Sequence, residues 1–101
     1  MPDEARVVDN PSELRYELVV DGQLAGSIRY RRQPGALALV HTEIEPAFEG
    51  RGLGKRLIGE ALADIRSRGL HLVPVCVSVR AYLDRHQEDR DLVVADTQEV
   101  D

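Results

Sequence analysis

Hydrophobic and polar residues alternate through the first half of the chain, which indicates β-strands with one buried face. The alternation is clearest over residues 14–20, and the Asp21-Gly22 that follows is typical of a type I′ hairpin turn. In the returning strand we expect one face to carry Leu24, Gly26, Ile28 and Tyr30. The predicted strands of this antiparallel meander are residues 6–9, 14–20, 24–32 and 36–44.

The hydrophobic period changes to that of an amphipathic helix after Gly52. The polar side of this helix offers two oppositely charged pairs at i,i+4 spacing, Arg56–Glu60 and Asp64–Arg68. Gly69 stands where a glycine commonly ends a helix, and Gly59 inside the helix indicates close packing on a neighbour. The predicted apolar stripe is Leu53, Leu57, Ile58, Ala61, Leu62 and Ile65.

The last third of the chain predicts one more strand and a short helix. The apolar residues 70–75 follow the long helix, so we expect them to pair in parallel with residues 36–44 through a right-handed crossover. Pro74 removes one ladder donor, which favours a bulge or an edge position. A short helix is predicted over residues 79–86 and a final turn over residues 91–94. Together the elements predict an α+β fold with a mixed, mostly antiparallel sheet, one long crossover helix and a short C-terminal helix.

The composition is that of an ordinary globular domain. With 101 residues, 43% of them hydrophobic, we expect one domain over residues 1–101, ordered over about 6–94. A net charge of −5 argues against a nucleic-acid binder that works by bulk charge. An acidic start and the lack of any long apolar run predict a cytoplasmic protein without a membrane span. One cysteine and three scattered histidines predict neither a disulfide nor a metal site, and His71 and His86 are interpreted as surface or helix-end residues.

A glycine-rich turn, Gly50-Arg51-Gly52-Leu53-Gly54-Lys55, stands between the meander and the long helix. This arrangement holds a phosphate well, because N–H groups in a first helical turn lack partners and glycine lets the backbone approach the anion. The spacing fits neither the P-loop, where Arg56 replaces the hydroxyl residue, nor the Rossmann fingerprint. From the residues alone, a plain turn that binds nothing stays open as the alternative.

The segment Glu49-Gly50-Arg51-Gly52-Leu53-Gly54 resembles the acetyl-CoA pyrophosphate loop of the GNAT acetyltransferase superfamily, Gln/Arg-x-x-Gly-x-Gly/Ala, with Glu49 departing at the first position. Ile44-Glu45-Pro46 resembles the end of the superfamily strand that pairs with the pantetheine arm. With His41-Thr42-Glu43 and Cys76-x5-Tyr82-x3-His86, the chain resembles the minimal single-domain group of that superfamily over about residues 8–94. The resemblance implies a GNAT-like fold whose strands before and after the long helix splay apart around the thioester of acetyl-CoA.

The resemblance also implies which residues bind acetyl-CoA and which act on it. Cys76 would take the acetyl group or line the cleft, and Tyr82 would protonate the departing CoA thiolate or hydrogen-bond the thioester sulfur. His41 would accept a proton from the amine, with Glu43 as an alternative base. The ordinary alternatives are a buried cysteine, a tyrosine packed on the sheet and a strand histidine bonded to backbone. The implied cofactor-binding residues are Thr42, Glu43, Ile44, Gly50, Arg51, Gly52, Leu53, Gly54, Lys55 and Arg56.

We therefore predict an acetyl-CoA-dependent acetyltransferase that acts on an amine of a small molecule or a protein. The alternatives are an acyl-CoA-binding module with little or no catalysis and a non-enzymatic interaction domain. Larger members of the superfamily carry two helices between their first two strands, and this chain lacks them. Its acceptor pocket is therefore expected to be shallow or completed by a partner, and an exposed strand edge is compatible with a homodimer. Neither nucleic acid nor a membrane is among the predicted partners.

Overall fold

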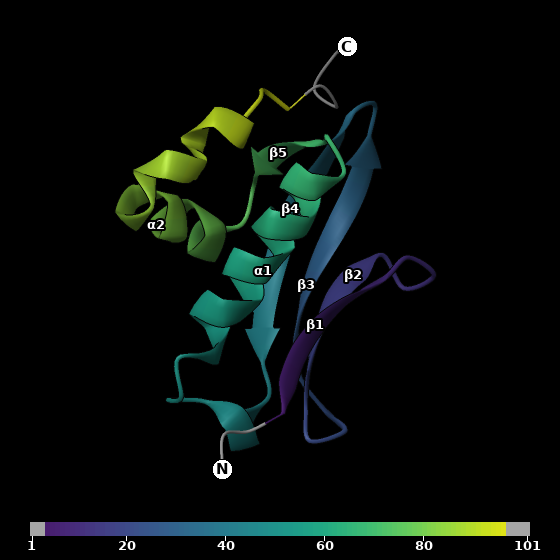
Figure 1. The fold of residues 1–101 in the computed structure, drawn as a ribbon, viewed down its shortest axis with the longest axis vertical. Coiled ribbons are helices and arrows are strands. Elements are labelled where there is room, and N and C mark those ends of the chain that lie inside the picture. The colour runs from purple at the N-terminus through teal and green to yellow at the C-terminus, as the bar shows by residue number, and fades with distance from the viewer. Residues whose placement is uncertain (1–3, 97–101) are drawn as a thin grey trace.

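A five-stranded sheet runs through the computed structural model, which describes residues 4–96 (Figure 1). The strands lie side by side in chain order, and all neighbours are antiparallel except β4 and β5, which are parallel. This topology confirms the predicted α+β fold and the predicted pairing of the last strand. The elements are β1 (Ala5–Asn10), β2 (Arg15–Val20), β3 (Gln23–Gln33), β4 (Ala36–Ile44), η1 (Pro46–Phe48), α1 (Leu53–Ser67), β5 (His71–Pro74), α2 (Val77–Arg85) and η2 (Gln87–Leu92).

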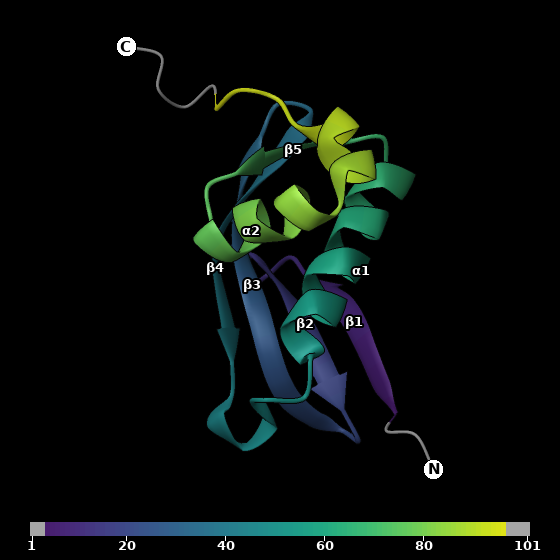
Figure 2. The same cartoon turned by 90° about the vertical axis from the view of Figure 1, so that its left-hand side faces the viewer.

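Helices α1 and α2 cover the same face of the sheet, with α1 lying along it (Figures 1 and 2). The predicted stripe of α1 faces the sheet: Leu53 is half-buried, and the other five members are buried. The core beneath it is formed on the sheet side by Tyr16, Leu18, Val20, Ile28, Tyr30, Leu37, Leu39 and Leu72. Burial of these aliphatic and aromatic side chains is the main stabilising contribution to the fold. The other face of the sheet carries no helix in the part of the chain that the structure describes.

The sequence of α1 explains its C-terminal end and its two ion pairs at i,i+4 spacing. Gly69 has a φ of 69°, and the N–H groups of Gly69 and Leu70 donate to the carbonyls of Arg66 and Ile65 at 3.0 Å each, which is a Schellman motif. Gly69 therefore ends the helix as predicted. Both predicted i,i+4 ion pairs of the helix form, with N–O distances of 2.7 Å for Arg56–Glu60 and 3.2 Å for Asp64–Arg68.

A bulge in β3 corrects one predicted strand face. Leu18 is opposite Gly26 while the next residue of β2, Val19, is opposite Leu24, so Ala25 is the extra residue. Ala25 is fully buried, and Leu24 points outward with 41% of its surface exposed. The prediction that Leu24 shares a face with Gly26, Ile28 and Tyr30 is therefore wrong, because an inserted residue reverses the alternation.

Strands β4 and β5 separate after only a few residues. Their last pair is Leu39 with Pro74, and the N–H groups of Val75 and Cys76 then both donate to the Leu39 carbonyl, at 3.1 and 2.8 Å. Strand β5 is the last strand of the sheet, so the predicted edge position of Pro74 is confirmed. Beyond this point β4 continues to Ile44, and no other segment of residues 4–96 pairs with it on that side, which leaves a gap between the strands.

The chain after α2 differs from the prediction of a final turn over residues 91–94. The segment η2 ends at Leu92, and Val93 then forms a single parallel bridge beside Leu72. The Val94 N–H donates to the Leu72 carbonyl at 2.9 Å, so the chain returns to the outer side of β5 in place of a turn. Residues 1–3 and 97–101 of the predicted domain lie outside the described residues.

Candidate functional site

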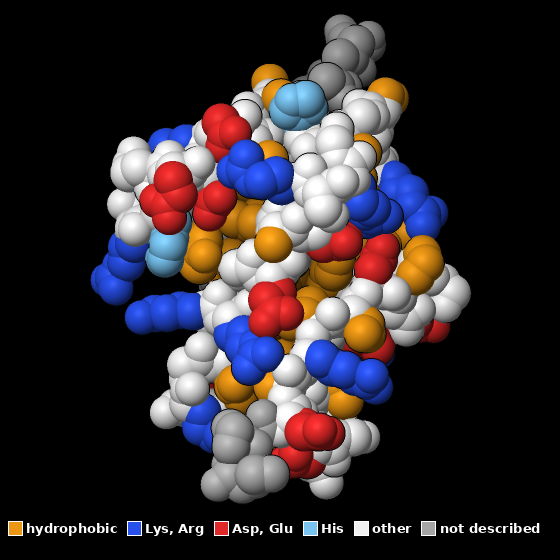
Figure 3. Space-filling model, viewed as in Figure 1, with side chains coloured by type: hydrophobic (Ala, Val, Ile, Leu, Met, Phe, Trp, Pro, Cys, Tyr) orange, Lys and Arg blue, Asp and Glu red, His pale blue; other side chains and the backbone are white. Residues whose placement is uncertain are grey.

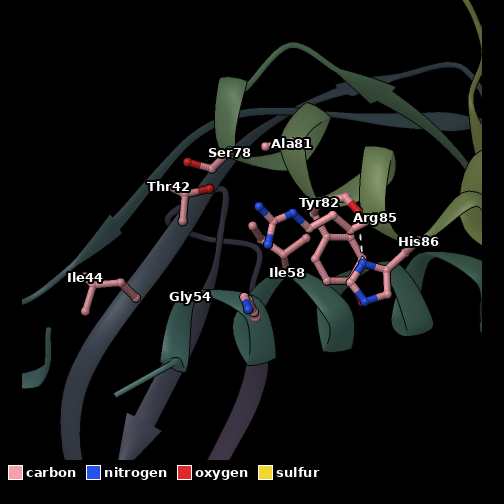
Figure 4. Close-up of a pocket in the computed structure, with 10 residues that line it drawn as sticks. Thr42, Ile44, Gly54, Ile58, Ser78, Ala81, Tyr82, Arg85 and His86 are labelled. Atoms are coloured by element: carbon pink, nitrogen blue, oxygen red, sulfur yellow. Dashed lines mark hydrogen bonds between the residues drawn. The ribbon is translucent and has the colours of Figure 1, made fainter. Parts of the chain in front are cut away.

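A cleft of about 390 Å³ opens at the gap between β4 and β5, between the first turn of α1 and helix α2 (Figure 4). Figure 4 shows Thr42 and Ser78 on one side of the cleft and Tyr82, Arg85 and His86 on the facing side. Ile44, Ile58 and Ala81 add apolar surface to the lining. The lining residues are Thr42, Ile44, Gly54, Lys55, Ile58, Ser78, Ala81, Tyr82, Arg85 and His86. The cleft thus suits an elongated ligand that is apolar along part of its length and charged at one end.

The cleft side of β4 is formed by Thr42 and Ile44, whose side chains line it. A second bulge precedes them, because Leu39 is opposite Tyr30 and His41 is opposite Arg29, which makes Val40 the extra residue. The Glu45 N–H donates to Ala25 at 2.8 Å, so backbone groups of odd-numbered residues here point toward β3. By alternation, the N–H and C=O groups of Thr42 and Ile44 point to the unpaired edge. They form a hydrogen-bonding track beside the cleft.

The glycine-rich turn brings the N-terminus of α1 to the same cleft. Gly50 and Gly52 have φ values of 79° and 72°, in the left-handed region that glycine adopts at little cost. Gly52 is the N-cap residue and, having no side chain, offers no cap to the first-turn N–H groups. Those groups and the positive end of the helix dipole are therefore available to an anion. Gly54 and Lys55 line the cleft from this turn.

Two arginines predicted to bind the cofactor, Arg51 and Arg56, contact groups outside the cleft. The Arg56 guanidinium donates to Glu60 at 2.7 Å and to the Ala5 carbonyl at 2.8 Å, which directs it toward β1. The Arg51 guanidinium lies 5.3 Å from the centre of the Phe48 ring, a cation–π distance. Neither side chain lines the cleft, so of the predicted cations in the loop only Lys55 is brought to it.

Cys76 lies beside the gap as the N-cap residue of α2, and only 6% of its surface is exposed. Its Sγ is 3.3 Å from Oγ1 of Thr42, which connects it to the cleft lining. Burial raises the pKa of the thiol, but hydrogen bonds from Thr42, Val79 and Ser78 together outweigh burial, so the pKa lies below its ordinary value. The structure thus places Cys76 next to the cleft wall, with Thr42 between it and the cleft.

Tyr82 and His86 form the opposite wall as a stacked pair. Their ring centres are 3.8 Å apart with an angle of 9° between the planes, and the Tyr82 carbonyl lies 2.9 Å from Nδ1 of His86. Burial, with a contribution from Asp89 and Glu88, raises the pKa of Tyr82. His86 does stand at a helix end, as predicted, but it also lines the cleft. Its spacing of four residues from Tyr82, one helical turn, is the signal that could have assigned it to the site.

His41 and Glu43 lie on the sheet face away from the cleft, because they alternate with Thr42 and Ile44 along β4. Their side chains are 64% and 70% exposed, and His41 Nε2 is 3.8 Å from Glu43 Oε2. The structure therefore does not bring the predicted base, or the side chain of the predicted cofactor contact Glu43, into the cleft with the other site residues. Both side chains are instead on the open face beside the gap.

Residues 4–96 contain neither a candidate metal site nor a helix that could span a membrane. In that range no three or more histidine, cysteine, aspartate or glutamate side chains gather in a way that could hold a metal ion. Neither does any helix among these residues have the length and apolar character needed to cross a membrane.

Comparison with known proteins identifies the family to which this fold belongs. Residues 15–92 match the model of the GCN5-related N-acetyltransferases. This match covers most of the chain, so the protein belongs to that family, the GNAT superfamily of the predicted resemblance. The chain matches no curated protein sequence.

A solved structure has the same fold. The protein is similar to a GCN5-like protein from Staphylococcus aureus, known from its NMR solution structure, with a TM-score of 0.66 and 17% sequence identity. The similarity covers 93% of this chain and 92% of the other. At this identity the comparison shows a shared fold, which agrees with the family match.

Proposed function

We propose that this protein transfers the acetyl group of acetyl-CoA to an amine, in the cleft beside β4. The family and the fold support acyl transfer in general. The observation that carries the proposal is that one cleft combines the unpaired edge of β4 with the helix N-terminus that follows the glycine-rich turn. A thioester with a peptide-like arm and a charged end requires both features.

The pyrophosphate of the cofactor would be bound by the first turn of α1. Backbone N–H groups at Gly52, Leu53 and Gly54 donate to its oxygens, and the helix dipole favours its negative charge. Lys55 adds a cation at the cleft. The amides of the pantetheine arm would bond to Thr42 and Ile44, whose backbone groups face the unpaired edge. This arrangement leads the thioester to the end of the cleft beside Thr42 and Cys76.

The transfer step needs a nucleophile, a proton acceptor and a proton donor. The amine nitrogen attacks the thioester carbonyl carbon, a C–N bond forms, and the C–S bond breaks to release CoA as a thiolate. A phenol is protonated at neutral pH, and Tyr82, which lines the cleft from α2, is the residue we assign to supply the proton to the leaving sulfur. Holding the two reactants together contributes much of the rate.

The acceptor would approach from the open face of the sheet, because the cofactor fills the helix side of the gap. His41 and Glu43 stand on that face and are the residues we assign to accept the proton of the amine. Strands β1 and β2 are joined by a turn of residues 11–14, where larger members of the family carry helices. The acceptor side is therefore broad and exposed, which favours an amine on a flexible chain or on a protein surface.

Turnover with a panel of amines tests this function. Purified protein is mixed with acetyl-CoA and small amines, lysine peptides or peptide N-termini, and release of the CoA thiol is followed together with acetylation of the amine by mass spectrometry. We expect release that depends on the amine and falls in His41→Ala. Binding of acetyl-CoA without transfer to any amine would contradict the proposal and support an acyl-CoA-binding module.

A further inference from the structure

Most cations on the helices of this protein are neutralised by nearby carboxylates. The partnered arginines are Arg56 with Glu60, Arg66 with Asp89 and Asp91, Arg68 with Asp9 and Asp64, and Arg90 with Asp84. The side chains of Lys55, Arg80 and Arg85 are different, because they form no ion pair or hydrogen bond within residues 4–96. Unpaired cations are notable in a chain whose net charge is −5.

Lys55 and Arg85 also share a location, since both line the cleft that we assign to the cofactor. They come from different helices: Lys55 from the first turn of α1 and Arg85 from the last turn of α2. In Figure 4 the Arg85 side chain extends from α2 over the cleft. The space-filling view shows Lys and Arg side chains projecting from this flank beside a histidine (Figure 3). Two helices thus bring positive charge to the same cleft.

This inference rests on the proposed function, because it takes CoA as the ligand of the cleft. CoA carries a pyrophosphate and a separate phosphomonoester on its ribose. The pyrophosphate is accounted for by the backbone N–H groups of α1, which leaves the phosphomonoester without a partner. That group carries close to two negative charges at neutral pH, and a guanidinium can donate two parallel hydrogen bonds to it.

We propose that Arg85, assisted by Lys55, binds the ribose 3′-phosphate of CoA and makes the cleft select CoA over carriers that lack this phosphate. Those carriers are 3′-dephospho-CoA and protein-bound phosphopantetheine. Two of the acids that follow in η2, Asp89 and Asp91, are paired with Arg66 and not with Arg85. Selection then depends on Arg85, because Lys55 lies next to the first-turn N–H groups and attracts the pyrophosphate as well.

The test is titration calorimetry with acetyl-CoA and with acetyl-3′-dephospho-CoA. The variants are Arg85→Gln, Arg85→Lys and Arg80→Gln, the last being a matched control because Arg80 is an exposed arginine of α2 that does not line the cleft. In wild type and Arg80→Gln we expect acetyl-CoA to bind roughly tenfold more tightly than the dephospho compound. In Arg85→Gln we expect this preference to disappear through weaker binding of acetyl-CoA alone. Arg85→Lys should retain part of the preference, because it keeps the charge.

Other outcomes overturn the inference and separate it from the proposed function. If wild type binds both compounds equally, or if Arg85→Gln lowers the affinity for both by the same factor, Arg85 does not bind the 3′-phosphate. The proposed function stands in either case. If wild type binds neither compound, the cleft is not a CoA site and both proposals fail. Circular dichroism of each variant shows that the fold is kept.

Discussion

The phenol oxygen of Tyr82 lies directly over Gly59, so that a Cβ at position 59 would come within 2.9 Å of it. The ring is fixed from the other side by its stacking on His86. Contact between a glycine of α1 and a tyrosine of α2 therefore sets how closely the two helices approach along the cleft. This close approach is the packing that the mid-helix glycine predicted.

Gly59→Ala tests this packing. Alanine should stabilise a helix interior by about 1 kcal/mol over glycine, but overpacking against the Tyr82 hydroxyl costs about 1–3 kcal/mol. We expect no gain in the free energy of unfolding in the wild-type background, and a gain of about 1 kcal/mol when Tyr82→Phe has removed the hydroxyl. Urea denaturation of the four proteins measures the difference. Equal effects of Gly59→Ala in the two backgrounds would show that the contact carries no strain.

The hydrogen bond between Thr42 and Cys76 should be visible in the reactivity of the thiol. Because Thr42 lowers the pKa of Cys76, Thr42→Val is expected to move the midpoint of the pH–alkylation profile to higher pH. Cys76 is the only cysteine of the chain, so the rate of iodoacetamide labelling reports on it alone. Thr42→Ser keeps the hydroxyl and should leave the midpoint near that of wild type. An unchanged midpoint in Thr42→Val would mean that this hydrogen bond does not tune the thiol.

The tyrosines should make the fold sensitive to alkaline pH. Burial, and then the hydrogen bond to Asp9, raises the pKa of Tyr30 to about 12, and burial is also the largest cause of raised pKa values for Tyr16 and Tyr82. A pKa raised above its unfolded value of about 10 stabilises the fold below pH 10, and this contribution is lost as pH rises toward 12. We expect the free energy of unfolding to fall over that window, and to fall less steeply in Tyr30→Phe.

Tyrosinate absorbance supplies an independent measurement of the same effect. In the folded protein all three phenols should ionise at higher pH than in denaturant, where the midpoint is expected near pH 10. A titration that is identical with and without denaturant would contradict the burial and bonding described for these side chains.

Local patterns were sufficient to predict most of the fold. The apolar stripe of α1, the glycine that ends it and the edge position of Pro74 each follow from a side chain acting on its own backbone or on its nearest neighbours. The parallel pairing of β5 with β4 follows from connectivity, since a strand that comes after a helix returns in the same direction. These features depend on short-range chemistry that is present in the sequence itself.

Two β-bulges explain why the sequence did not predict which side chains of β3 and β4 face the helices. Strict alternation from Leu39 would place His41 in the cleft, but the extra residue Val40 reverses the faces and places Thr42 there. The same effect moved Leu24 outward. The pairing of Arg56 with the Ala5 carbonyl joins segments far apart in sequence, and no local pattern specifies it. Side-chain placement in the site thus depended on register, which only the assembled sheet defines.

Binding of acetyl-CoA to the glycine-rich turn is the central claim, and titration calorimetry with two matched glycine variants tests it most directly. Gly52 and Gly35 have φ values of 72° and 71°, and a Cβ at either would have nothing within 4 Å, but Gly35 lies in the turn between β3 and β4. Gly52→Asp places a carboxylate where the pyrophosphate should bind, and Gly35→Asp imposes the same backbone strain elsewhere. We predict Kd values of about a micromolar for wild type and Gly35→Asp and no binding for Gly52→Asp. No binding to wild type, or equal binding to all three proteins, would contradict the account.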